Sequence, residues 1–224
     1  MFVQLSLILS VLIASFVSSY YLRKETFSDV PPVIQPKDIA FSIWSLIFVT
    51  GILRAALSVT QSLDAFQLLS LLFHTFAFCS CAAWAPVFSV QRLRLACALI
   101  TLATVFAFSS LLLASINSWY DLLVHSGVDL LAGWLSVALS LSLVLAGLAP
   151  DSTAVLLLFT TGLSFTAVLV SRPLLLLPLL WALLLQNVYD NNIRLSVSVI
   201  TLGLVSSFLS RSASNRDSRP YSQR

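Results

Sequence analysis

Two polar side chains, Arg54 and His74, lie inside long runs of apolar residues and are the first candidates for chemistry. An imidazole can ligate haem iron or hydrogen-bond a ligand, and an arginine inside a bundle can form an ion pair or contact a ligand. For each residue the sequence favours a purely structural role over a role in binding. His74 then makes one hydrogen bond between helices, and Arg54 extends to the lipid headgroups, with Asp64 in the next turn as its partner.

A second set of titratable residues, Asp121, His125 and Asp129, recurs every four positions. On a helix this spacing forms one polar stripe, which could relay protons or coordinate an ion. The favoured interpretation is a solvated face at the membrane boundary, because Trp119 and Tyr120 beside it are residues that prefer that depth.

Metal and catalytic motifs are missing from the sequence. Cys79 and Cys81 follow His74 by five and seven residues, and neither spacing places the groups on one helical face for a shared metal. No glycine-rich phosphate loop, HExxH motif or CxxC pair occurs. Lys24 and Lys37 lie outside the apolar runs, so a retinal Schiff base is excluded in practice. We expect a protein that is not an enzyme, with no metal site.

The composition determines what kind of element must carry these residues. The 224-residue chain is 58% hydrophobic and only 9% charged, with a mean hydropathy of +0.97. A soluble domain is roughly 45–50% apolar and about 25% charged, so this composition excludes one. A net charge of +3 is too small for a nucleic-acid surface. The lipid bilayer is therefore the expected environment, although the sequence indicates no organelle.

Charged residues, prolines and asparagines divide the chain into about eight apolar stretches, each near the roughly 20 residues that a membrane helix needs. They lie near residues 2–22, 40–60, 65–89, 94–115, 128–149, 153–171, 173–189 and 193–210. Seven spans are the main alternative, because the breaks after 149 and 189 are short. The runs are continuously apolar, whereas barrel strands alternate, so we predict an all-α polytopic bundle.

The ends of the bundle are less well defined by the sequence. The first stretch ends in small residues, as a signal peptide does, but it has no basic start and is longer than a usual signal, so we expect a retained helix. Basic residues are shared almost evenly between the two faces, so the charge bias does not decide the orientation.

The longest polar interruption, residues 23–40, contains Pro31, Pro32 and Pro36. These prolines prevent a continuous helix and stiffen the backbone, so we expect a shaped cap over the bundle. The segment leads directly into AFSIWSLIFVTGI, where Trp44 and Phe48 are one helical turn apart on the same face.

This arrangement resembles the translocator protein / tryptophan-rich sensory protein (TspO/MBR) family, whose first loop carries a proline pair and enters the second helix through a Trp. The matching positions here are Pro36, Trp44, Ile47, Phe48 and the Gly51–Ile52 step. CAAWAPVF at residues 81–88, with Trp84 and Phe88, is similar to the signature of the family's third helix. Trp134 corresponds to a Trp in the fifth helix.

The resemblance covers residues 1–149 and implies a five-helix core with the 23–40 loop as a lid. Residues 150–210 would then add about three transmembrane helices, and 211–224 a short basic tail, as in longer relatives of the family. The resemblance also implies a pocket for a hydrophobic ligand such as a tetrapyrrole or sterol, with porphyrin or haem as a ligand rather than a required cofactor. Its implied lining is Pro32, Pro36, Trp44, Phe48, Trp84, Phe88 and Trp134, with Arg54 and His74 as further polar contacts.

Four positions depart from the family pattern. Asp38 and Phe48 replace a Trp and a Tyr, and Ala82 and Ser142 replace two Asn residues. Because these positions supply much of the family's pocket lining, the departures bear on porphyrin recognition more than on the fold. They favour a rival hypothesis, a structural or assembly subunit of a larger membrane complex. The expected protein partners are accordingly a homo-oligomer or such a complex. A transporter ranks third, because charge inside the spans is sparse.

Overall fold

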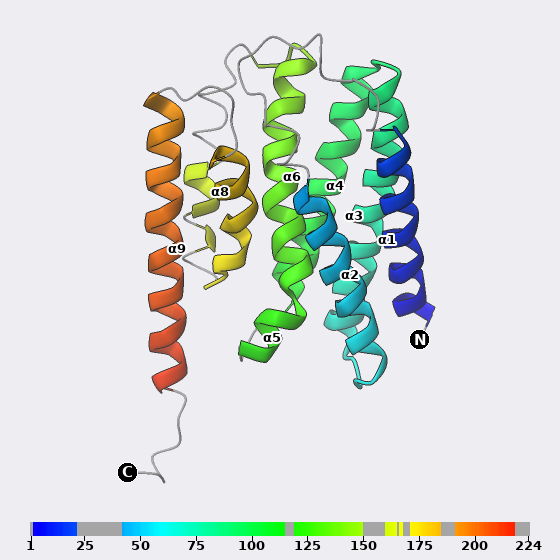
Figure 1. Ribbon diagram of the computed structural model, residues 1–224. Coiled ribbons are helices and arrows are strands. Elements are labelled where there is room, and N and C mark those ends of the chain that lie inside the picture. Colours follow the sequence, from blue (N-terminus) through cyan, green and yellow to red (C-terminus); the bar gives the residue numbers. More distant parts are fainter. Residues whose placement is uncertain are drawn as a thin grey trace.

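The computed structural model describes residues 2–21, 42–114, 119–149, 160–164, 166–167, 171–184 and 191–217. Within these ranges the protein is an all-α bundle without a strand. The helices stand side by side, with α1 and α9 at the two edges in Figure 1. Their bounds are α1 Phe2–Tyr21, α2 Ile43–Val59, α3 Ala65–Ser89, α4 Leu93–Leu113, α5 Trp119–Val124, α6 Ser126–Leu145, the 3-10 helix η2 Pro173–Leu176, α8 Leu177–Leu184 and α9 Asn191–Asp217.

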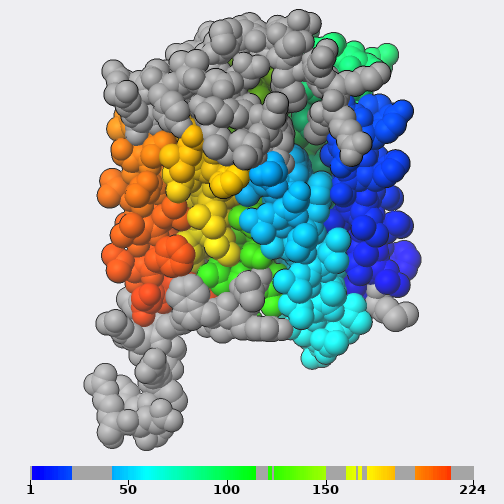
Figure 2. Space-filling view, viewed as in Figure 1, coloured from blue at the N-terminus to red at the C-terminus, as the bar shows by residue number. Residues whose placement is uncertain are grey.

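These helices confirm the predicted fold class of a polytopic helical bundle. Five described helices are long and apolar enough to cross a membrane: α1, α3, α4, α6 and the Leu195–Ser212 part of α9. The apolar helix α2 and the Pro173–Leu184 segment are shorter. The predicted span at 153–171 and the loop at 23–40 lie largely or wholly outside the described residues. Helices α1 and α9 carry exposed apolar side chains such as Leu9, Phe16, Leu202 and Leu209, which suits contact with lipid. Figure 2 shows these two helices at opposite edges of the molecule.

The helices alternate in direction. Figure 1 shows that the first residues of α1, α3 and α6 and the last residues of α2, α4 and α9 lie at the same end of the bundle as α5. We call this the α5 end. Short turns at 60–64 and 90–92 reverse the chain between α2, α3 and α4, and the first of them places the start of α3 next to the end of α2.

The start of α3 corrects one prediction about Arg54. Asp64 caps this helix: its carboxylate accepts a hydrogen bond from the backbone N–H of Gln67, and the Gln67 side chain accepts one from the Asp64 backbone N–H. This reciprocal pair satisfies two N–H groups that a helix start leaves without partners. Asp64 is therefore occupied as a helix cap, and the predicted Arg54–Asp64 ion pair is wrong.

Small residues allow α6 to act as the centre of the bundle. It packs against α2, α4, η2 and α8. A β-carbon on Gly127 would lie 2.9 Å from the backbone of Thr50 in α2, and one on Gly133 would overlap the carbonyl oxygen of Leu175 in η2. Glycine is needed at both positions because the backbones approach too closely for a side chain. The α6 helix thereby joins the N-terminal helices to η2 and α8.

Candidate functional site

Aromatic side chains from three helices meet inside the bundle, at the end opposite α5. Trp44 stacks on Phe48 one turn later in α2, with 5.4 Å between ring centroids, and meets Trp134 of α6 edge-to-face at 6.2 Å. Trp84 stacks on Phe88 one turn later in α3, at 5.1 Å. These separations are within the range in which aromatic pairs attract. The spacing of four residues in α2 and α3 places each pair on one helical face.

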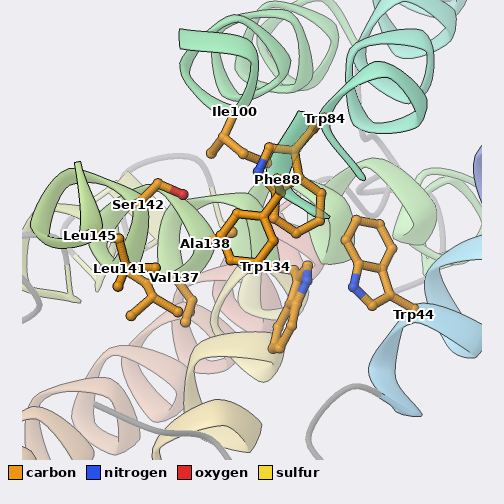
Figure 3. Close-up of a pocket in the computed structure, with 10 residues that line it drawn as sticks. All are labelled: Trp44, Trp84, Phe88, Ile100, Trp134, Val137, Ala138, Leu141, Ser142 and Leu145. Atoms are coloured by element: carbon orange, nitrogen blue, oxygen red, sulfur yellow. The ribbon is translucent and has the colours of Figure 1, made fainter. Parts of the chain in front are cut away.

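A cavity of about 40 Å³, which we call the aromatic cavity, lies between these rings. Figure 3 shows the rings of Trp44, Trp84, Phe88 and Trp134 turned towards it, with side chains of α6 along another wall. The lining is completed by Ile100, Val137, Ala138, Leu141, Ser142 and Leu145. The α6 members share one face, because they recur at three- and four-residue intervals. The cavity is apolar apart from Ser142 and the indole nitrogens.

The indole N–H of Trp84 is the most informative polar group in this lining. Trp84 is 7% exposed, and its Nε1 has no hydrogen-bond partner among the described residues. A buried tryptophan N–H normally has such a partner, and leaving one unsatisfied costs about 1–3 kcal/mol. The wall of the aromatic cavity is therefore apolar and encloses one donor that has no partner among the described residues.

The structure brings together four of the seven residues in the expected lining: Trp44, Trp84, Phe88 and Trp134. Phe48 does not line the cavity, but it stacks on Trp44 and lies 6.1 Å from Phe78, between ring centroids. Pro32 and Pro36 fall outside the described residues. Ser142, which the resemblance had marked as a departure at a position of the family's pocket lining, also lines the cavity.

Arg54 is not at the membrane surface, which contradicts the favoured interpretation of this residue. Its side chain is 1% exposed, and the guanidinium points into the bundle. One Nη donates to Nδ1 of His74 at 2.9 Å and to Oγ of Ser110 at 3.2 Å, and the other donates to Oγ of Ser70 at 2.7 Å. These partners lie on α3 and α4, so Arg54 connects three helices. The side chain faces the bundle, as the alternative interpretation expected, but its partners there are two hydroxyls and an imidazole and not the expected ion pair.

Ser70 and Ser110 suit this arrangement because each hydroxyl both donates and accepts. The Ser70 hydroxyl donates to the Ser110 carbonyl at 2.7 Å, and the Ser110 hydroxyl donates to the Ser70 carbonyl at 2.7 Å. Their oxygen lone pairs then accept the Arg54 N–H groups. The sequence reasoning missed both serines, since an isolated serine in an apolar run has no distinguishing pattern.

His74 makes the interhelical hydrogen bond that the sequence favoured, and this prediction is confirmed. Since Arg54 can only donate, Nδ1 must accept, which places the proton of the neutral ring on Nε2. The ring also lies 5.0 Å from Phe78, between centroids. Among the described residues no group of three or more His, Cys, Asp or Glu side chains could hold a metal ion.

The predicted polar stripe does not form a solvated face, because Asp129 is fully buried. Its Oδ1 accepts a hydrogen bond from Arg172 at 2.7 Å, and the two residues form an ion pair. Arg172 also donates to the backbone carbonyl of Ala114 and is 3% exposed. This pair ties α6 to the start of η2 and to the end of α4. The sequence had placed Asp129 on a solvated face at the membrane boundary, and the solvated face is wrong, because Arg172 pairs with the carboxylate inside the bundle.

The remaining two members of the stripe lie near a second cavity. Asp121 is half-buried in α5, and His125 occupies the turn between α5 and α6, where the helix breaks. His125 lies outside the candidate spans, and desolvation by the surrounding protein lowers its pKa to about 3, so the ring is neutral at pH 7. The side chains of Trp119 and Tyr120 are outside the described set.

No family model matches the chain, and neither a curated protein nor a solved structure matches it.

Proposed function

We propose that this multi-pass membrane protein binds an apolar ligand with a hydrogen-bond acceptor in the aromatic cavity. The observation that carries the proposal is the N–H of Trp84, which is buried in the wall of that cavity without a partner among the described residues. A carbonyl or ring-nitrogen acceptor on the ligand would satisfy this donor, and the surrounding rings supply an apolar contact surface. The proposed activity is binding without catalysis.

The resemblance to the TspO/MBR family is the second support. It placed Trp44, Trp84, Phe88 and Trp134 in one ligand pocket, and these four side chains surround one cavity. We therefore propose membership of that family and retain its ligand class, a tetrapyrrole or a sterol, as the class to test first.

The size of the cavity defines how such a ligand would bind. The cavity measures about 40 Å³, whereas pockets for drug-sized ligands measure about 300–1,000 Å³. A tetrapyrrole or sterol can enter only if the stacked rings separate. Binding would therefore rearrange Trp44, Trp84 and Trp134, and tryptophan fluorescence should report it directly.

The same small volume favours a second candidate function, a structural or assembly subunit of a larger membrane complex. In that case the aromatic side chains are core packing, and the Arg54 and Arg172 clusters hold the helices in place. A fixed set of proteins recovered with the full chain in mild detergent, together with failure of the ligand titration, would support this candidate.

The decisive experiment titrates the purified full-length protein in detergent with protoporphyrin IX and, separately, with a fluorescent sterol, while tryptophan emission is recorded. Saturable quenching is expected for at least one of the two probes. Trp84→Phe keeps most of the ring surface and removes the N–H, so affinity should fall about 2- to 13-fold, as expected for one hydrogen bond of 0.5–1.5 kcal/mol.

Trp181→Phe is the matched control, because Trp181 is 39% exposed on α8 and does not line the aromatic cavity. This variant should bind as the wild type does. Absence of saturable quenching with both probes contradicts the proposed function, as does an equal loss of affinity in the two variants.

A further inference from the structure

A second cavity, of about 80 Å³, lies at the α5 end of the bundle. We call it the polar cavity. It is lined by Arg54, Ser58, Gln61, Leu63, Gln67, Leu71, Asp121, Val124 and His125. These residues come from the end of α2, the turn after it, the start of α3, and α5 with the turn that follows. The polar cavity therefore shares no lining residue with the aromatic cavity and is formed by the opposite ends of the helices.

Arg54 provides the charge in the wall of the polar cavity. Its two Nη atoms are hydrogen-bonded, but Nε has no partner among the described residues. Within the same residues its guanidinium has no carboxylate at ion-pair distance, since the buried Asp129 is paired with Arg172. The partners of Arg54 are two hydroxyls and an imidazole, which satisfy hydrogen bonds but leave the positive charge without a counter-charge. A buried cation normally requires one.

The other residues that line the cavity decide whether an anionic or a cationic ligand fits. His125 is neutral at pH 7, and its Nδ1 is buried without a partner among the described residues. In the tautomer protonated at Nδ1, it could donate a second hydrogen bond. Asp121 also lines the cavity and opposes an anion, but it is half-buried, so solvent screens it more than it screens the fully buried Arg54. An anionic acceptor close to Arg54 is therefore favoured over a cation.

The position and size of the cavity agree with this chemistry. Arg54 lies five residues before the end of α2, which at about 1.5 Å per residue is about 7.5 Å from the helix terminus. The cavity is therefore within about two helical turns of that end of the bundle. The volume of about 80 Å³ is several times larger than the 10–15 Å³ that one water molecule requires. A small anionic group therefore has room in the cavity.

We infer that the polar cavity binds a carboxylate or phosphate group at Nε of Arg54, supplied either by a lipid headgroup or by a free anion. The inference does not depend on ligand binding in the aromatic cavity, because the two sites differ in lining, chemistry and position.

Two measurements on the full-length protein distinguish the sources of the anion. The first records the melting temperature in uncharged detergent during titration with inorganic phosphate. The second counts lipids retained by the protein, using native mass spectrometry after reconstitution in phosphatidylcholine with or without phosphatidic acid. Phosphate-dependent stabilisation identifies a free anion, and selective retention of phosphatidic acid identifies a headgroup. The absence of both effects overturns the inference.

Gln61→Glu is the main variant, because Gln61 is exposed in the turn after α2 and the change adds a negative charge to the cavity lining without disturbing the bonds of Arg54. Binding should weaken about two- to fivefold, because solvent screens a charge at this exposed position, whereas Gln61→Asn should bind nearly as the wild type does. Arg54→Lys keeps the charge and removes the Nε–H, so binding should weaken about 10- to 100-fold.

Arg92→Gln is the matched control for charge, since Arg92 is exposed at the opposite end of the bundle, between α3 and α4. It should leave binding unchanged. If Arg92→Gln weakens binding as much as Gln61→Glu does, the anion is held by the overall charge of the protein, and the assignment to the polar cavity is wrong.

Discussion

The buried ion pair between Arg172 and Asp129 should be stabilising only as long as both partners are present. Asp129→Asn leaves the Arg172 guanidinium buried with the Ala114 carbonyl as its remaining described partner, and Arg172→Met leaves a carboxylate that is 0% exposed. Removing one partner of a buried pair costs about 3–5 kcal/mol, because the other charge stays without compensation. Each single variant should therefore lose about this much of the free energy of unfolding.

The double variant, Asp129→Asn with Arg172→Met, removes both charges and should be more stable than either single variant. Loss of 3–5 kcal/mol corresponds to a drop of about 6–20 °C in the melting temperature, at about 2–4 °C per kcal/mol for a chain of this size. Thermal melting of the four proteins in detergent, followed by tryptophan fluorescence, gives the coupling energy as a double-mutant cycle. Arg92→Met, at an exposed position, is the control and should change stability by at most about 0.5 kcal/mol.

Two results would refute this reasoning. Single variants that melt within about 2 °C of the wild type would mean that the pair contributes almost nothing, as exposed pairs do. A double variant whose loss equals the sum of the two single losses would mean that the residues act independently.

Two further predictions concern the packing of α6 and the turn before it. Gly133→Ala places a methyl group against the Leu175 carbonyl, so η2 and α8 should shift away from α6. We expect the free energy of unfolding to fall by about 1–3 kcal/mol and limited proteolysis after residue 149 to become faster. An unchanged digestion pattern would contradict this close contact. His125 has a pKa of about 3 in the folded protein, below its ordinary value of 6.5. As the pH drops from about 6.5 towards 3, the unfolded chain therefore binds a proton that the folded protein does not bind, and the free energy of unfolding should fall. His125→Gln should flatten this part of the pH profile of the melting temperature, and an unchanged slope in the variant would show that another group is responsible.

Much of the helical architecture could be predicted because charged and polar residues interrupt the apolar runs. The expected stretch 65–89 coincides with α3, and 94–115 and 128–149 differ from α4 and α6 by a few residues at their ends. The break at His125 was not predicted, since the pattern of Asp121, His125 and Asp129 continues a helical spacing through it. That spacing is correct for a helix, but it does not show which residues face protein and which face solvent.

Spacing within a single helix could place Trp44 and Phe48 on one face, because they are one turn apart. That aromatic side chains of α2, α3 and α6 meet at one pocket was implied only by the resemblance to the TspO/MBR family.

The polar contacts could not be predicted in either way. Arg54 is buried against Ser70 and Ser110, which lie 16 and 56 positions away in the sequence, and Asp129 and Arg172 are 43 positions apart. Local spacing does not reveal contacts between residues this far apart. When such partners are not known, an arginine near a helix end is expected to contact the headgroups, because this costs less free energy than burying its charge in the bundle. The cavity volumes are likewise set by tertiary packing, which local spacing does not determine.

The central claim is that the Trp84 N–H receives an acceptor from a ligand in the aromatic cavity. The most direct test records the indole ¹H–¹⁵N resonances of the labelled full-length protein in detergent during titration with protoporphyrin IX or the sterol, with the Trp84 signal assigned by its loss in Trp84→Phe. We predict that the Trp84 signal shifts downfield and saturates, while the Trp181 signal stays in place. A Trp84 signal that does not move with either ligand at saturating concentration would contradict the claim.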